Sequence, residues 1–242
     1  MLSERRTSTA RLAMRISIIV PVLNERECIC ETLRSLQQLE GEKEIIVVDG
    51  GSSDGTVSLA LAEGVKVVTA SPGRGVQMHA GVVDASGDVL WFVHADTVPP
   101  AHALQEIRKG LDDPRITGGN FGLVFDGHSR AARRLTAIYP MLRILGLCYG
   151  DSGIFVRRET YDRIGGFRPL ALFEDLDLLR RLRKAGPFVH LPCRIRTSSR
   201  RFEHRNFLLV WLHWTTLQVL YWLGVSPNWL ARWYRHVRRS SD

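Results

Sequence analysis

Acidic and small polar residues follow an apolar run in the segment IIVVDGGSSDGT, residues Ile45 to Thr56. Ser, Asp and Gly are the residues that a turn and a helix cap require, so turn chemistry alone accounts for Ser52 to Gly55. It does not account for Asp49, because a carboxylate at the end of a buried strand is costly without a partner. The carboxyl ends of strands in open α/β sheets border ligand crevices, which makes Asp49 a candidate ligand contact.

Three more predicted strands end in polar segments, and parallel strands bring such ends to one edge of a sheet. The segments PVLNE, SPGRG and HADTVPP begin at Pro21, Ser71 and His94. In a nearly extended chain, His94 and Asp96 would point to one side. Each segment alone fits a loop or a helix cap, but four together favour a binding site. Arg74 at a helix start suits phosphate, and a carboxylate that faces a diphosphate needs a divalent cation, Mg²⁺ or Mn²⁺.

A second acidic group opens the predicted helix FEDLDLLRRLRKAG with Glu174 and Asp175. Acidic residues in a first turn also have an ordinary structural role, because they complement the helix dipole. The segment GDSG places Asp151 in a glycine-bounded loop, and TSSRRFEHR supplies Arg200 and Arg201, a pair that could clamp a diphosphate. The glycine spacing fits neither a P-loop nor GxGxxG, which counts against ATP hydrolysis and a Rossmann dehydrogenase.

Apolar runs alternate with helical periodicity, and this pattern predicts an α/β protein with a mostly parallel sheet flanked by helices. The predicted strands are 16–20, 44–48, 65–69, 89–94, 116–125 and 154–156. The predicted helices are 26–39, 56–63, 75–85, 100–111, 129–145 and 173–184. A further apolar helix is expected near the carboxyl terminus, and we find no internal repeat.

Composition and charge fit a single globular domain with appended helices, since the chain has 242 residues, of which 45% are hydrophobic. The surplus of 33 Lys and Arg over 25 Asp and Glu makes nucleotide phosphates, anionic lipid or nucleic acid plausible partners. We do not predict nucleic-acid binding, because the strand-end carboxylates would repel its phosphates. The four cysteines are too scattered for a zinc site, which favours reduced thiols in the cytoplasm.

The two ends of the chain differ from this domain, which we place at residues 15–204. Residues 1–14 are basic, lack an apolar core and predict a disordered extension, with Met14 as a hypothetical translation start. The Trp-rich tail, 205–242, holds FLLVWLHWTTLQVLYWLGV between arginines. Three interpretations remain open for it: a helix packed on the domain, a helix in the membrane interface, and a membrane span. Its tryptophans and basic flanks favour the interface.

Taken together and in order, these motifs resemble family 2 glycosyltransferases with the GT-A fold, a Rossmann-like fold of nucleotide-diphospho-sugar transferases. The motifs are PVLNE, IIVVDGGSSDGT, HAD, YGDSGIF, GGF and FEDLDLLRRLR, and the resemblance runs from about Arg15 to Phe202. The segment TSSRRFE and the Trp-rich tail resemble the small bacterial branch that is often associated with radical-SAM and selenium-linked genes.

The resemblance implies a nucleoside-diphosphate sugar as donor, a divalent cation, and a role for each matched residue. The positions matched to the nucleotide and its diphosphate are Pro21, Glu25, Asp49, Asp54, Arg74, His94, Arg200 and Arg201. The metal position, the last carboxylate of the DxD motif, is Asp96. The catalytic base matches Asp175, with Glu174 beside it, and the acceptor positions are Gly150 and Asp151.

Three residues depart from the pattern of many relatives. His94 stands in place of the first Asp of DxD, Phe202 in place of a Trp after the arginine pair, and His79 in place of an Asn. The implied reaction is an inverting transfer, in which the base deprotonates the acceptor hydroxyl as it attacks the anomeric carbon opposite the leaving diphosphate.

Two alternatives to this transfer remain open. One is a nucleotidyltransferase on a similar sheet, which would release pyrophosphate, and the other is a sugar-nucleotide-binding protein without turnover. The acceptor is either lipid-linked and close to the membrane or soluble. The basic helix at 129–145 and the tail favour peripheral contact with the inner face of the cell membrane, which would place a cytoplasmic enzyme there.

Overall fold

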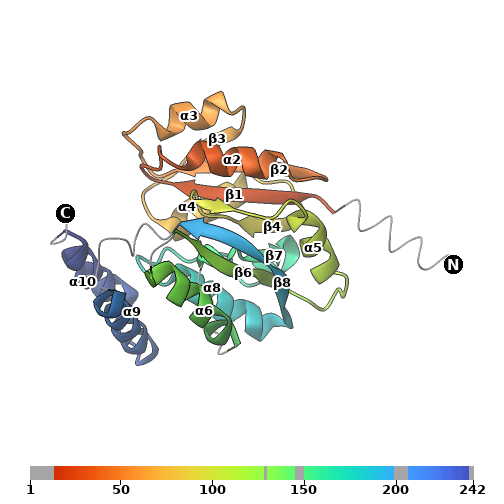
Figure 1. The fold of residues 1–242 in the computed structure, drawn as a ribbon. Helices are drawn as coiled ribbons and strands as arrows, with labels where there is room; N and C mark the ends of the chain where they lie inside the picture. The colour runs from red at the N-terminus through yellow and green to blue at the C-terminus, as the bar shows by residue number, and fades with distance from the viewer. Residues whose placement is uncertain (1–13, 128–129, 145–149, 199–206, 240–242) are drawn as a thin grey trace.

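The computed structural model describes residues 14–127, 130–144, 150–198 and 207–239, which form an α/β structure (Figure 1). The strands are β1 Ile16–Val22, β2 Lys43–Asp49, β3 Lys66–Thr69, β4 Val89–Phe92, β5 Thr97–Val98, β6 Gly118–Asp126, β7 Phe155–Arg157 and β8 Phe188–Ser198. The helices are α2 Ile29–Gln37, α3 Thr56–Ala62, α4 Arg74–Val83, α5 Ala103–Gly110, α6 Arg130–Ile144, α7 Arg158–Arg163, α8 Glu174–Ala185, α9 Phe207–Trp222 and α10 Pro227–Arg239, with a 3₁₀ turn η1 at Gly150–Ser152.

The strands form a single eight-stranded sheet in the order β3-β2-β1-β4-β7-β6-β8-β5. Strands β1 to β4 are parallel to one another, β7 runs antiparallel between β4 and β6, β8 is parallel to β6, and β5 is antiparallel to β8. Val22 pairs with Asp49, so β1 and β2 end side by side. The expected α/β class with a mostly parallel sheet is confirmed.

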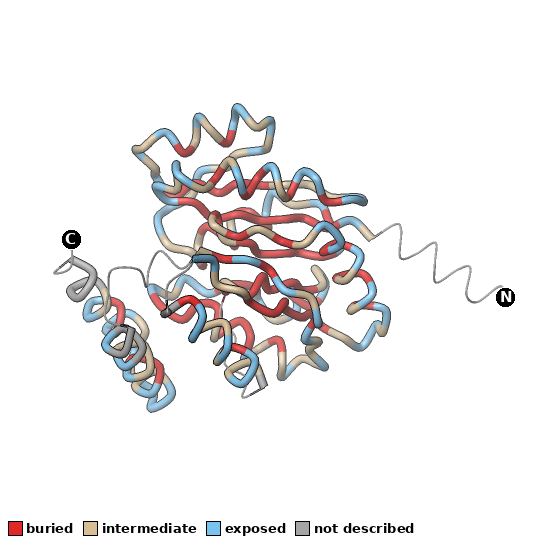
Figure 2. Tube along the Cα trace, viewed as in Figure 1, coloured by how far each residue is buried: buried red, intermediate tan, exposed pale blue. Residues whose placement is uncertain are grey.

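Two hydrophobic cores lie on the two faces of the sheet, because alternate residues of a strand point to opposite sides. Ile18 and Trp91 face one core together with α2, α5 and α6. Ile19 and Phe92 face the other core together with α4 and α8. Every residue of β1 is buried, which explains its continuous apolar run (Figure 2).

Strand β8 is the longest strand that the sequence pattern did not predict. Its sequence FVHLPCRIRTS mixes apolar with polar residues and contains Pro192, which obscures the strand pattern. It nevertheless pairs with most of β6, with an irregularity between Asn120 and Gly122. Helix α7 and the two-residue β5 also went unpredicted, since short segments give little periodic signal.

The tail helices α9 and α10 pack beside the beginning of α8 (Figure 1). The ring of Phe173, directly before α8, lies 5.0 Å from the Tyr221 ring and 6.4 Å from the Trp214 ring. Leu217 is fully buried in this small core. Within the described ranges, no helix is both long and apolar enough to cross a bilayer. One face of these helices packs on the domain through the contacts around Phe173.

The described chain begins at Met14, which contacts the core that contains α2 and α5. The Met14 carbonyl accepts hydrogen bonds from Nε and Nη2 of Arg108, each at 3.1 Å. Burial lowers the pKa of the Arg108 guanidinium, which nevertheless donates to the Met14 carbonyl. The extension expected at residues 1–14 otherwise lies outside the described residues.

Candidate active site

Two loops that follow neighbouring strands are joined by hydrogen bonds. The backbone N–H of Asn24 donates to the Ser52 hydroxyl at 2.9 Å, and the Asn24 side-chain oxygen accepts the Ser53 N–H at 2.9 Å. The Arg26 N–H donates to Asp54 at 3.1 Å. Asn24 has a positive φ of 56°, a conformation that Asn tolerates better than most residues. The ends of β1 and β2 therefore form one connected surface.

The structure gives the Asp49 carboxylate the partners that its burial requires. Its buried carboxylate accepts the N–H groups of Gly51 at 2.9 Å and Ser52 at 3.0 Å, so it shapes the turn that follows β2. Asp54 accepts the N–H of Thr56 at 3.0 Å and its hydroxyl at 2.5 Å, and the hydroxyl bond is the main reason that the pKa of Asp54 is lowered. Both carboxylates hold the turn in a fixed form.

Two further predicted nucleotide contacts belong to the same surface. Pro21 pairs with Val48 in the register of β1 and β2, one residue before the strands end. The N–H of Glu25 donates to the Thr56 hydroxyl at 2.9 Å, which ties the loop after β1 to the start of α3. The structure thus brings Pro21, Glu25, Asp49 and Asp54 to adjoining strand ends.

Arg74 and Glu174 form an ion pair across the starts of α4 and α8. The Arg74 Nε lies 2.8 Å from the Glu174 Oε1, and the Glu174 side chain is buried. Burial raises the pKa of Glu174, while the Arg74 guanidinium opposes that rise. The two helices approach closely here, since a Cβ on Gly75 would lie 3.1 Å from the Glu174 Cβ. Arg74, predicted to lie near diphosphate, therefore also neutralises a buried carboxylate.

Asp175, Gly150 and His94 meet in one cluster, in which His94 is half-buried. Asp175 is buried at the start of α8, and its Oδ2 accepts the Gly150 N–H at 2.6 Å while its Oδ1 accepts the Leu176 N–H at 2.8 Å. A Cβ on Gly150 would lie 3.2 Å from the His94 Nε2 and 3.3 Å from the Asp175 Oδ2. A side chain at position 150 would therefore crowd both groups, which explains the glycine in the GDSG segment.

The HAD segment differs from the extended chain that we expected. Strand β4 ends at Phe92, and the Thr97 N–H donates to the His94 carbonyl at 3.2 Å, so residues 94–97 form a turn. The expectation that His94 and Asp96 share one side of an extended segment is wrong, because the turn bond places the chain in a bend. His94 approaches Gly150, whereas Asp96 lines a cavity.

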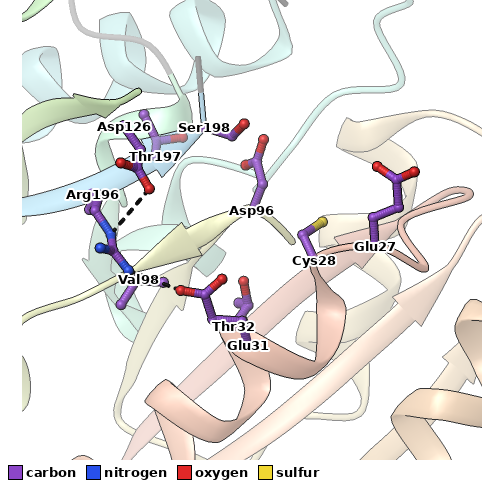
Figure 3. Close-up of a pocket in the computed structure, with 10 residues that line it drawn as sticks. All are labelled: Glu27, Cys28, Glu31, Thr32, Asp96, Val98, Asp126, Arg196, Thr197 and Ser198. Atoms are coloured by element: carbon purple, nitrogen blue, oxygen red, sulfur yellow. Dashed lines mark hydrogen bonds and ion pairs between the residues drawn. The ribbon is translucent and has the colours of Figure 1, made fainter. Parts of the chain in front are cut away.

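That cavity has a volume of about 250 Å³ and lies between the start of α2, β5 and the ends of β6 and β8 (Figure 3). The Arg196 guanidinium lies 2.9 Å from Glu31 and 3.6 Å from Asp126, so it neutralises part of the acidic lining. The lining residues are Glu27, Cys28, Glu31, Thr32, Asp96, Val98, Asp126, Arg196, Thr197 and Ser198.

The metal expectation can be tested against the donor set. In the described part of the chain, no group of three or more His, Cys, Asp and Glu residues is placed to hold a metal ion. Mg²⁺ is commonly bound by one or two carboxylates together with waters and substrate phosphates. Asp96 at an open cavity fits a cation that arrives with a diphosphate, and does not fit a cation held by protein ligands alone.

Asn120 is a site residue that sequence reasoning missed. It is fully buried, its Nδ2 donates to the Ser152 hydroxyl at 3.0 Å, and its Oδ1 lies 2.7 Å from the His190 Nδ1. Arg143 donates to the Asn120 carbonyl at 2.9 Å. This network fixes the η1 turn that carries Gly150 and Asp151. An amide inside the apolar segment GGNFGLVF was the available signal.

The GGF motif is held by a second missed residue, Tyr161 of α7. The Tyr161 oxygen accepts the Phe167 N–H at 3.0 Å and lies 3.0 Å from the His79 Nδ1. Burial raises the pKa of Tyr161 to about 12, so the phenol stays protonated at neutral pH. His79, the residue that departs from the pattern of relatives, thus has a structural partner.

Arg200 and Arg201 lie outside the described residues, and their diphosphate contact stays a prediction. Strand β8 ends at Ser198, whose N–H donates to the Asp96 carbonyl at 3.3 Å. The chain therefore passes Asp96 directly before it reaches this arginine pair.

The joined strand-end turns and the acidic start of α8 define an α/β protein with a site at the carboxyl edge of its sheet. The family model for glycosyl transferase family 2 matches residues 17–170, and the chain belongs to this family. The match includes the joined turns, the HAD turn and η1, and ends just before α8.

The chain is also similar to individual relatives over part of their length. The chain is 32% identical over 126 residues to glucosyl-3-phosphoglycerate synthase of Mycobacterium tuberculosis, which covers 48% of this chain and 38% of that protein. It is 25% identical over 205 residues to the probable glycosyltransferase YdaM of Bacillus subtilis, which covers 71% of this chain and 47% of that protein. The chain thus spans less than half the length of these two relatives.

Among solved structures, the chain is similar to the Mycobacterium tuberculosis glucosyl-3-phosphoglycerate synthase in complex with Mn²⁺, uridine diphosphate and glucosyl-3-phosphoglycerate. The TM-score is 0.57 and the identity 26%, over 76% of this chain and 72% of that chain. It also resembles S. aureus TarS 1–349 with a TM-score of 0.64 and 19% identity, over 77% of this chain and 61% of that chain. The second likeness concerns the fold alone.

Proposed function

We propose that this chain is an inverting, metal-dependent glycosyltransferase that moves a sugar from a nucleoside-diphosphate sugar to an acceptor hydroxyl. The observation that carries the proposal is the buried Asp175, which meets Gly150 and His94 at the site edge of the sheet. A carboxylate held by two backbone N–H groups keeps a fixed direction, as a general base requires.

The reaction follows from the placement of these residues. Asp175 takes the proton of the acceptor hydroxyl, the acceptor oxygen forms a bond to the anomeric carbon, and the bond from that carbon to the diphosphate oxygen breaks. The electron pair leaves with the nucleoside diphosphate. Arg74, at the first turn of α4, stabilises the negative charge of this leaving group. Its pairing with Glu174 keeps the guanidinium near the base.

The donor side of the proposal rests on the joined turns and on the relatives. Pro21, Glu25, Asp49 and Asp54 would hold the nucleotide on the surface formed by the ends of β1 and β2. The structure of the mycobacterial synthase contains uridine diphosphate and Mn²⁺, which supports a nucleoside diphosphate and a divalent cation here. When bound, the cation would neutralise diphosphate oxygens, and Asp96 would hold it.

The acceptor side is formed by η1, where Gly150 and Asp151 lie next to the proposed base. We propose a cytoplasmic enzyme, because the scattered positions of the four cysteines favour reduced thiols. We also propose that it acts at the inner face of the membrane, on an acceptor that is lipid-linked or soluble.

The test is thermal stabilisation of the purified chain by nucleoside diphosphates and sugar nucleotides, with Mn²⁺, Mg²⁺ or EDTA. One nucleoside diphosphate is expected to raise the melting temperature only with a metal, because binding to the folded state stabilises it. Asp96→Asn should lose the metal-dependent part, whereas Asp126→Asn, which changes another carboxylate of the same cavity, should keep it. Metal-independent stabilisation in the wild type would contradict the metal role, and no stabilisation by any nucleotide would contradict the donor site.

A further inference from the structure

Helix α9 has apolar residues on nearly all sides, although it lies at the surface of the molecule (Figure 1). One side is covered, because Leu217, Trp214 and Tyr221 pack toward Phe173. The opposite side is exposed and continues into the connection to α10. Helices that are apolar all round are normally buried in protein or lipid. The exposed large residues of this side are Leu209, Leu212, Val219, Trp222 and Leu223.

Helix α10 lies against α9, since the Tyr234 ring is 5.2 Å from the Trp214 ring and 6.5 Å from the His213 ring. Its Leu230 and Ala231 are buried in the contact. Trp229 and Trp233 point away from it, half exposed, with ring centroids 5.6 Å apart. The two helices and their connection, residues 207–239, are called the tail hairpin below.

The charge of this region is entirely positive. Between Glu203 and Asp242 the sequence has five arginines and no Asp or Glu; the arginines are Arg205, Arg232, Arg235, Arg238 and Arg239. Arg232 is exposed between Trp229 and Trp233. Trp rings prefer the level of the lipid headgroups, and arginines beside them are attracted to anionic lipid.

We propose that the tail hairpin docks the protein on an anionic lipid bilayer, with its exposed leucines and tryptophans in the headgroup layer. The described helices are too short or too polar to span, so the contact is peripheral. It does not depend on the transferase activity, because it uses residues outside the joined turns and the acidic start of α8.

A second copy of the chain is the other occupant that an exposed apolar face suggests. In a twofold dimer the same patch of both subunits meets itself. Here such a contact would bring the arginine-rich hairpins together with no acidic residue of residues 204–241 to pair with them. Like charges brought together in an interface are unfavourable, whereas anionic headgroups neutralise them. The charge pattern therefore favours lipid.

Docking through this hairpin would bring the site close to the membrane. The α9 rings contact Phe173, the residue directly before Glu174 and Asp175. The exposed side of α9 lies across one helix diameter, about 10 Å, from that contact. A docked protein would thus hold its proposed base near the headgroup layer.

The experiment is flotation of the full chain with vesicles of phosphatidylcholine alone and of phosphatidylcholine mixed with phosphatidylglycerol, without nucleotide. The wild type is expected to float with the mixed vesicles and to bind at least about tenfold less to the neutral ones, because the arginines supply part of the attraction. The double variant Trp229→Ser/Trp233→Ser should lower the partition coefficient on mixed vesicles by about tenfold or more. High salt should weaken wild-type binding.

The matched control is Leu61→Ser/Val83→Ser, which removes apolar side chains that are 58% and 77% exposed on α3 and α4, compared with 51% and 50% for the two tryptophans. This control should float like the wild type. Lack of wild-type flotation with the mixed vesicles would overturn the proposal. An equal loss of vesicle binding in both double variants would also overturn it. A wild-type dimer in solution that becomes a monomer on Trp229→Ser/Trp233→Ser would assign the face to a second copy instead. Nucleotide stabilisation, measured separately, reports on the transferase proposal.

Discussion

Replacing Arg74 by Ala isolates the physical role of the ion pair between α4 and α8. The variant leaves the buried Glu174 carboxylate without the guanidinium that lies 2.8 Å away. Breaking a buried pair in this way costs about 3–5 kcal/mol, but the Arg74 side chain is 37% exposed, and solvent screening lowers the effect. We expect Arg74→Ala to lower the free energy of unfolding by about 2 kcal/mol at neutral pH.

A second variant and the pH separate charge from packing. In Arg74→Ala, burial holds the folded-state pKa of Glu174 above its unfolded value of about 4.3. The charged carboxylate is therefore the costly form in the folded variant. The loss of free energy of unfolding in Arg74→Ala should appear as the pH rises from the unfolded-state to the folded-state pKa of Glu174, and it should shrink at lower pH. Arg74→Ala/Glu174→Gln should recover about half of the loss at neutral pH, because an amide leaves no buried charge.

The assay is urea denaturation of each variant at neutral and acidic pH. Arg34→Ala is the matched control, since Arg34 pairs with Glu63 at the same distance of 2.8 Å but is 66% exposed, and its effect on the free energy of unfolding should be much smaller than that of Arg74→Ala. An Arg74→Ala cost no larger than that of the control would refute the reasoning. So would an equal cost in the double variant.

Three further outcomes follow from the network around the site. Asn120→Ala should cost about 2 kcal/mol in urea denaturation, because the buried Ser152 hydroxyl loses the amide that donates to it, and should raise the acceptor KM more than it lowers kcat. Asp49→Asn should weaken nucleotide binding in calorimetry and cost about 1 kcal/mol, since an amide has one acceptor oxygen for two N–H groups. Burial, together with Arg143 and Arg183, lowers the pKa of His190 from 6.5 to about 4. The free energy of unfolding should therefore fall as the pH drops through this range, and the fall should be smaller in His190→Gln. Unchanged acceptor KM, nucleotide affinity or pH dependence, respectively, would contradict each statement.

The first half of the fold was predictable because its central strands are continuous apolar runs with turn residues behind them. Asp49 and Asp54 were recognised as parts of one turn for the same reason. The sequence could not show that Asp49 already has backbone partners, since these depend on the path of the turn. Strand β8 was missed because the burial of its residues depends on pairing with β6.

Long-range contacts set the rest of the site, and they leave no local pattern. Glu174 was placed beside the proposed base, but its pairing with Arg74, one hundred residues away, follows only from the approach of α4 and α8. The link from Asn120 to Ser152 is of the same kind. The HAD turn was predicted as extended because the apolar run before it continues beyond the last paired residue, Phe92.

The central claim is that Asp175 is the base of a sugar transfer from a nucleoside-diphosphate sugar. The most direct measurement is release of nucleoside diphosphate from a panel of sugar nucleotides with Mn²⁺ by the wild type, Asp175→Asn and Asp177→Asn. Asp177 lies on the same helix and pairs with Arg181 at 2.7 Å, so its variant controls for damage to α8. The account predicts release from one donor by the wild type and the control, and binding without release by Asp175→Asn. Wild-type release rates in Asp175→Asn, or no release from any donor by the wild type, would contradict it.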